Sequence, residues 1–184
     1  MAETPLARVG QTEEIEVIWR PFELRPEGTP PKDRAYLENA FNNWVLPMAK
    51  ELGVDMKMPT HQPLTRLAHE AAAFARAIGK EAELADGLFK AYWIDGRDIG
   101  QVEVLCDVAL SVGIDPVELR GALEERSQRS QVEGELRLAQ QYRITGVPFF
   151  IFDGRYAASG LQREEQLRRA IAMCRGEGLV QLEE

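Results

Sequence analysis

A chain of 184 residues is long enough for one domain with a sizeable core, or for a core domain that carries an insertion. Hydrophobic residues make up 45% of it and charged residues 28%, which is ordinary for a globular protein. A formal net charge of -8, with the basic residues interleaved among Glu and Asp, argues against nucleic acid as a partner. The sequence has no apolar leader and no apolar run of membrane length, so we expect a cytoplasmic protein with no membrane partner.

The first part of the chain predicts a strand and a longer helix. Alternating apolar and acidic residues then predict one β-strand from Ile15 to about Phe22. After a proline-rich exit, apolar residues at helical spacing predict a helix from about Asp33 to Leu52, which Pro47 should kink or interrupt.

The middle of the chain predicts further helices. An apolar stripe beginning at Leu64 and ending at Ile78 marks an amphipathic helix that Gly79 ends. Asp115 precedes Pro116 and is expected to cap a later helix. The further helices are predicted at Glu81 to Tyr92, Val102 to Val112, Pro116 to Glu124 and about Gln128 to Tyr142.

Strand character returns near the C-terminus. Pro148 to Phe152 and Arg155 to Ala158 flank Asp153-Gly154, and this turn chemistry predicts a β-hairpin. A last helix follows, with Ser159 at its N-cap and Gln162 at the spacing of a capping box.

Three short motifs, in this order, resemble the DsbA-like family. They are Trp19-Arg20-Pro21-Phe22-Glu23-Leu24, Gly96-Arg97-Asp98-Ile99 and Gly146-Val147-Pro148. Within that family the resemblance is greatest to the FrnE and 2-hydroxychromene-2-carboxylate isomerase branch, and it spans about residues 6–175. It implies an α/β, thioredoxin-like fold with an inserted all-helical domain. Residues 1–30 and 143–184 would form the thioredoxin-like core, and residues 31–142 the insert.

The family begins with a central strand and a Cys-x-x-C motif, and this sequence contains no Cys-x-x-C. The resemblance therefore implies a thioredoxin-like fold that is incomplete at its N-terminus. Two strands that flank a missing one would leave backbone groups unpaired, at a cost of about 1–3 kcal/mol each. We expect the gap to be filled by a rearranged sheet, by a partner chain such as a second copy, or by upstream residues outside this sequence, and we favour the last.

The resemblance also implies a substrate-binding loop in which Pro148 is cis and the backbone of Val147 pairs with a bound peptide or glutathione. The residues of this loop are Thr145, Gly146, Val147 and Pro148. A second candidate is the start of the last helix, because helix N-termini bind anions. Its residues are Ser159, Gly160 and Gln162. Relatives that bind glutathione have a Ser-Asp pair there and this chain does not, so we favour plain capping.

Neither cysteine is predicted to be a nucleophile. Cys106 and Cys174 each share a helix face with apolar residues, and neither is at a helix N-terminus or beside a cation. No metal site is expected, because His61 and His69 have no acidic or cysteine ligand at a recognised spacing.

Three hypotheses about function follow, in order of preference. The first is a FrnE-like protein disulfide oxidoreductase scaffold that is redox-inactive as it stands, needs no cofactor and acts on a protein or peptide thiol or disulfide. The second is a glutathione-dependent isomerase or transferase of the kappa-like branch, with glutathione as its cofactor. The third is a peptide-binding or assembly module without enzymatic activity, which could form a homodimer.

Overall fold

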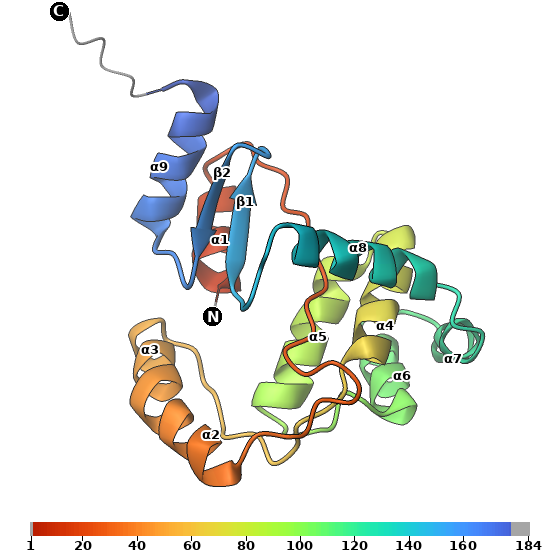
Figure 1. Cartoon of the computed structure of the whole chain (residues 1–184). Coiled ribbons are helices and arrows are strands. Elements are labelled where there is room, and N and C mark those ends of the chain that lie inside the picture. Colours follow the sequence, from red (N-terminus) through yellow and green to blue (C-terminus); the bar gives the residue numbers. More distant parts are fainter. Residues whose placement is uncertain (1, 178–184) are drawn as a thin grey trace, which may run out of the picture. The chain divides into compact units, whose positions relative to one another are not determined.

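The computed structural model describes residues 2–177 and divides the chain into two compact units (Figure 1). We call Met1–Trp19 with Tyr142–Glu184 the hairpin unit, and Arg20–Gln141 the helical unit. Met1 and residues 178–184 lie outside the described residues. The division into a core and an insert after residue 30 stays a prediction.

The helical unit begins with the long helix expected around Pro47, in three pieces. These are α2 (Arg34–Ala40), the π-helical segment η1 (Phe41–Val45) and α3 (Leu46–Glu51). The N–H of Leu46 donates to the carbonyl of Phe41, five residues back. Pro47 has no N–H to continue the α-helical ladder, so the change of helix type beside it is the predicted interruption.

Five helices form the rest of the helical unit, each within about two residues of its predicted bounds. They are α4 (Arg66–Ala77), α5 (Glu81–Trp93), α6 (Val102–Ser111), α7 (Pro116–Glu124) and α8 (Arg129–Gln141). The side chain of Asp115 caps α7 by accepting a hydrogen bond from the Val117 N–H at 2.8 Å, as predicted. Leu84, Leu105 and Leu119 are fully buried in a common apolar core of α4 to α7.

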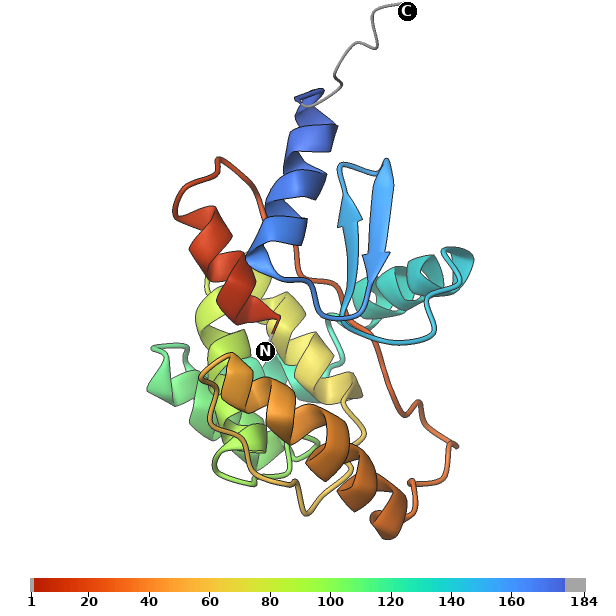
Figure 2. The same cartoon turned by 90° about the vertical axis from the view of Figure 1, so that its left-hand side faces the viewer.

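Within residues 2–177, the hairpin unit contains two helices and one β-hairpin (Figure 2). Its elements are α1 (Glu3–Gly10), β1 (Phe149–Phe152), β2 (Tyr156–Ser159) and α9 (Glu164–Arg175). β1 and β2 are antiparallel, with Phe150 opposite Ala158. Asp153 and Gly154 both have positive φ, 51° and 65°, which is the conformation of a type I′ hairpin turn. α1 packs against α9, and α9 packs against β1.

The strand predicted from Ile15 to about Phe22 is wrong. Residues 14–23 have no regular secondary structure, and Val17 and Ile18 are exposed. A strand needs a neighbour that pairs with its backbone, and within residues 2–177 the sheet has two strands, β1 and β2. An alternating pattern can indicate which residues would face a core, but it cannot supply that neighbour.

The predicted N-cap of the last helix is also wrong. Ser159 is the last residue of β2, and α9 begins four positions past Gly160, at Glu164. Arg163 is the N-cap, and its N–H donates to the side-chain carbonyl of Gln166 at 2.8 Å. Ser159 stays in β2 because it pairs with Phe149. The hydrogen bonding of the sheet therefore outweighs the capping-box pattern at this residue.

Candidate functional site

The residues predicted to form the binding loop lie between α8 and β1, and we call Thr145–Pro148 the proline loop. The Val147–Pro148 peptide bond is cis. Thr145 is exposed and Val147 is 48% exposed, whereas Gly146 and Pro148 are half-buried. The loop thus presents the residue that precedes the proline to solvent, at the point where β1 begins.

The second predicted set lies beside the proline loop. The Gly160 N–H donates to the carbonyl of Pro148 at 2.9 Å, so residues 159–162 and the proline loop share one end of the hairpin. The Gln162 side-chain amide donates to the carbonyls of Ser159 and Gly160, at 3.1 and 3.0 Å, and closes a tight turn. These residues form a turn ahead of α9 rather than its N-terminus.

The N-terminus of α9 itself carries acidic side chains. Glu164 and Glu165 occupy its first turn, where carboxylates interact favourably with the helix dipole. Glu164 also accepts an ion-paired hydrogen bond from Arg8 at 3.0 Å. An anionic ligand would meet these carboxylates, so an anion-binding role for Ser159, Gly160 and Gln162 remains a prediction without support from the helix dipole.

The edge of β1 opposite β2 is a strand edge that continues directly from the proline loop. Within residues 2–177, β1 has β2 as its one partner strand. Ile151 is 44% exposed, and the rings of Phe150 and Phe152 are stacked with centroids 6.1 Å apart. An exposed strand edge with apolar side chains can accept an additional strand from an extended peptide.

Both cysteines are free and neither is arranged as a nucleophile. Cys106 is buried in α6 among core side chains, as predicted, and burial raises the pKa of its thiol. A higher pKa lowers the thiolate fraction, and thiolate is the reactive form. Cys174 is half-buried near the end of α9, where its carbonyl accepts a hydrogen bond from Arg155.

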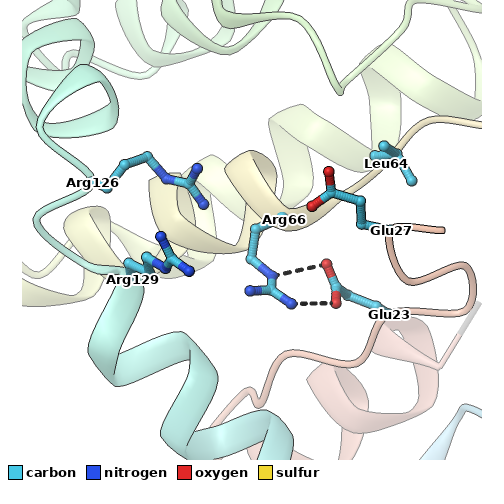
Figure 3. A pocket seen from close by; sticks show the side chains of 6 residues that line it. All are labelled: Glu23, Glu27, Leu64, Arg66, Arg126 and Arg129. Atoms are coloured by element: carbon cyan, nitrogen blue, oxygen red, sulfur yellow. Dashed lines mark hydrogen bonds and ion pairs between the residues drawn. The ribbon is translucent and has the colours of Figure 1, made fainter.

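The sequence analysis missed a network of ion pairs in the helical unit. Arg66 donates from Nε and Nη2 to the two oxygens of Glu23, at 2.9 and 2.7 Å (Figure 3). Arg126 makes the same two-point contact to Glu70, at 2.8 and 2.6 Å, and Glu70 is only 1% exposed. The available signal was a glutamate, Glu70, among the alanines of the apolar stripe of α4.

His69 belongs to the same region of α4. Burial lowers the pKa of its imidazole, and its Nε2 lies 3.3 Å from Oγ1 of Thr65. In the part of the chain that is described, no three His, Cys, Asp or Glu side chains come together as metal ligands.

Across that same part, none of the helices has the length and apolar character needed to cross a membrane.

The comparison with known families agrees with the motifs. Residues 2–172 match the model of the DSBA-like thioredoxin domain, and the chain belongs to this family. The uncharacterized protein YwbO of Bacillus subtilis (strain 168) is 32% identical over 165 residues, which cover 86% of this chain and 82% of that protein. The thiol:disulfide interchange protein DsbA of Azotobacter vinelandii is 24% identical over 153 residues, which cover 83% of this chain and 67% of that protein.

Solved structures confirm the fold. The probable DsbA oxidoreductase SCO1869 from Streptomyces coelicolor superposes with a TM-score of 0.81 at 22% identity, over 100% of this chain and 86% of that one. A 2-hydroxychromene-2-carboxylate isomerase superposes with a TM-score of 0.75 at 18% identity, over 95% of this chain and 89% of that one. The predicted DsbA-like family and the predicted thioredoxin-like α/β fold with a helical insertion are both confirmed.

Proposed function

We propose that this chain is a FrnE-like scaffold of the DsbA family that binds an extended protein or peptide segment along the proline loop and β1. We further propose that its own cysteines do not carry out dithiol exchange. The observation that carries the first part is the β1 edge, which has no strand partner on the side opposite β2 within residues 2–177. The second part rests on the two free thiols, of which Cys106 is buried with a raised pKa.

Strand addition explains how such a site would bind. Each main-chain hydrogen bond contributes about 0.5–1.5 kcal/mol net, so a peptide paired over four residues would bind weakly. Val147 and Ile151, 48% and 44% exposed, would add apolar contacts and give some preference for apolar side chains in the peptide. The substrate class is therefore an extended, partly apolar segment, such as a stretch of an unfolded protein that bears a thiol or a disulfide.

Binding can be tested with a fluorescent extended peptide and two lysine substitutions. Ile151→Lys places a charge on β1, and Ala157→Lys places the same charge directly across the hairpin on β2. We expect Ile151→Lys to weaken peptide binding at least roughly tenfold and Ala157→Lys to leave it nearly unchanged, because a charged edge opposes strand addition. Equal affinities of the two variants would rule out binding at β1.

The redox part has a separate test. In an insulin reduction assay with dithiothreitol, we expect the chain to give no acceleration over buffer, and Cys106→Ala and Cys174→Ala to change nothing. Turnover that is lost in either cysteine variant would overturn this part of the proposal. It would leave the peptide site unaffected, since that site uses neither thiol.

Glutathione is the alternative ligand. The neighbouring positions of the proline loop and the 159–162 turn favour a compact peptide-like ligand, whereas Glu164 and Glu165 disfavour its carboxylates. Titration with glutathione, followed by the fluorescence of Trp19, Trp44 and Trp93, distinguishes the two ligands. A saturable change below millimolar concentration would favour the isomerase or transferase function, and its absence would exclude it.

We also infer a cytoplasmic location and the possibility of a homodimer, and both can be tested. Two cysteines far apart in the sequence suit a reducing compartment, and cell fractionation tests this. The exposed β1 edge could also pair with a second copy of the chain. Size-exclusion chromatography would detect that homodimer, and a monodisperse monomer would exclude it.

A further inference from the structure

The helical unit contains a hollow whose walls carry three arginines (Figure 3). We call it the arginine hollow. It has a volume of about 140 Å³, several times the ~30 Å³ that one water molecule occupies in the liquid. Its lining residues are Glu23, Glu27, Leu64, Arg66, Arg126 and Arg129.

Each arginine is held by a carboxylate that uses only part of its guanidinium. Glu70 occupies Nε and Nη2 of Arg126, and Glu133 accepts from Nε of Arg129 at 2.7 Å. Within residues 2–177, Nη1 of Arg126 and both Nη atoms of Arg129 make no hydrogen bond to the protein. The carboxylates thus orient the guanidinium groups and leave several N–H donors for another acceptor.

Two further features bear on the charge of an occupant. Arg129 is the first residue of α8, a helix of 13 residues, so the positive end of the helix dipole lies at this wall of the hollow. Glu27 also lines the hollow, and within the described residues it forms no hydrogen bond or ion pair. In Figure 3 its carboxylate faces the arginines, so it is a competitor inside the chain for the same donors.

We propose that the arginine hollow binds a small oxyanion of the phosphate class. Guanidinium groups bind phosphate through paired N–H donors, and the unused Nη atoms of Arg126 and Arg129 provide donors from two residues. The small volume excludes a large ligand such as a nucleotide. Glu23, Glu70 and Glu133 balance the charges of the three arginines, so the attraction comes from the unused N–H donors and binding is weak. The carboxylate of Glu27 weakens it further.

Isothermal titration calorimetry with inorganic phosphate, at constant ionic strength set with chloride, tests the proposal. We expect Arg129→Gln to weaken phosphate binding by at least roughly tenfold, the effect of losing charge-assisted hydrogen bonds. The control is Arg137→Gln, which removes the same charge from an exposed position of α8 outside the hollow. We expect Glu27→Gln to act in the opposite direction and to tighten binding severalfold.

The outcomes separate a site from general charge effects. Equal weakening by Arg129→Gln and Arg137→Gln, or no phosphate binding by the unmodified chain at millimolar concentration, would overturn the proposal. The Arg129 side chain is 59% exposed, so its replacement should preserve the fold, which circular dichroism would check. Repeating the titration with glycerol 3-phosphate distinguishes free phosphate from a phosphomonoester: tighter binding identifies the ester as the better ligand, and loss of binding identifies the free ion.

Discussion

The two units of this chain differ in how they are stabilised. The helical unit buries twelve mutually packed side chains in one apolar core, from Ala68 on α4 to Leu123 on α7. In the described part of the hairpin unit, the buried apolar side chains are Pro5, Val9 and Leu167. Burial of apolar area is the main favourable contribution to folding, so the helical unit should carry most of the stability of the chain.

Ion pairs occur in both units, but in the hairpin unit few buried apolar side chains accompany them. Arg168 and Arg175 donate to the two carboxylate oxygens of Glu13, at 3.0 and 2.7 Å, and connect α9 to the segment after α1. These arginine side chains are 37% and 35% exposed, and such pairs contribute little in water. The unit with the candidate site therefore has the smaller apolar core, and within residues 2–177 the β1 edge opposite β2 has no strand partner.

The largest expected effect compares one buried leucine in each unit. Leu105→Ala should lower the free energy of unfolding of the helical unit by about 2–5 kcal/mol, because the surrounding core cannot collapse onto the cavity. Leu167→Ala should cost nearer about 2 kcal/mol, because fewer packed neighbours are lost. Urea unfolding followed at Trp93 and at Trp19 reports on each unit. Equal losses would contradict the claim that the hairpin unit has a thin core.

The next effect concerns the buried ion pair of the helical unit. Glu70→Gln removes the carboxylate that pairs with Arg126, and the Glu70 side chain is only 1% exposed. We expect the free energy of unfolding to fall by about 3 kcal/mol, the low end for a broken buried ion pair, because the Arg126 side chain still reaches water. Glu38→Gln, in an exposed pair with Arg34, should cost no more than about 0.5 kcal/mol. Similar losses in chemical denaturation would mean that burial does not distinguish these pairs.

A smaller effect tests how closely α5 and α6 approach each other. A Cβ on Gly87 would lie 2.7 Å from Cγ1 of Val108, so Gly87→Ala should destabilise by about 1–3 kcal/mol. Gly121→Ala is the matched change on α7, where a Cβ would meet nothing within 4 Å. It should stabilise by up to about 1 kcal/mol through helix propensity. Thermal unfolding should therefore move in opposite directions, and parallel shifts would be evidence against the close approach.

The pH dependence of the helical unit should include a contribution from His69. Its pKa is lowered in the folded chain, mainly by burial, so the unfolded chain takes up the proton first as the pH falls. Its contribution to stability is complete above about pH 6.5 and decreases below that value. Comparison of urea midpoints between about pH 5 and pH 8 should show a flatter profile for His69→Gln than for the unmodified chain. Identical profiles would exclude this contribution.

The smallest effect is expected at the ion pairs of the hairpin unit. Glu13→Gln should cost about 0.2–1 kcal/mol, and the difference should disappear near 1 M salt, where the Debye length is about 3 Å. Glu14→Gln is the control, because this neighbouring exposed side chain makes the same change in charge and Arg175 contacts only its backbone carbonyl. A loss from Glu13→Gln that persists in high salt would show that packing holds α9 in place.

Prediction from sequence succeeded where the relevant physics is local. Apolar stripes at helical spacing, Asp115 before Pro116, and Asp153-Gly154 between two apolar runs each specify an element without reference to distant residues. The DsbA-like family was identifiable from three motifs for the same reason, since a motif is a local pattern. The change of helix type at Pro47 also follows from a single missing N–H.

The errors and omissions all involve partners distant in sequence. Ile15 to Phe22 has the alternation of a strand, but no neighbouring strand among residues 2–177 pairs with it. Ser159 has the chemistry of an N-cap, but its pairing with Phe149 keeps it in β2. The arginine hollow joins the segment around Glu23 to α4 and to the start of α8, and no local pattern brings these together.

The amino-acid sequence by itself determined the helices, the hairpin turn, the family and the absence of a Cys-x-x-C pair, because these depend on residues a few positions apart. The tertiary structure decided which strands pair, where α9 begins and which charges meet in the helical unit. Those outcomes depend on contacts between distant segments, such as the 56-residue separation of Glu70 and Arg126. Such contacts form when packing and hydrogen bonding across the whole fold outweigh local preference.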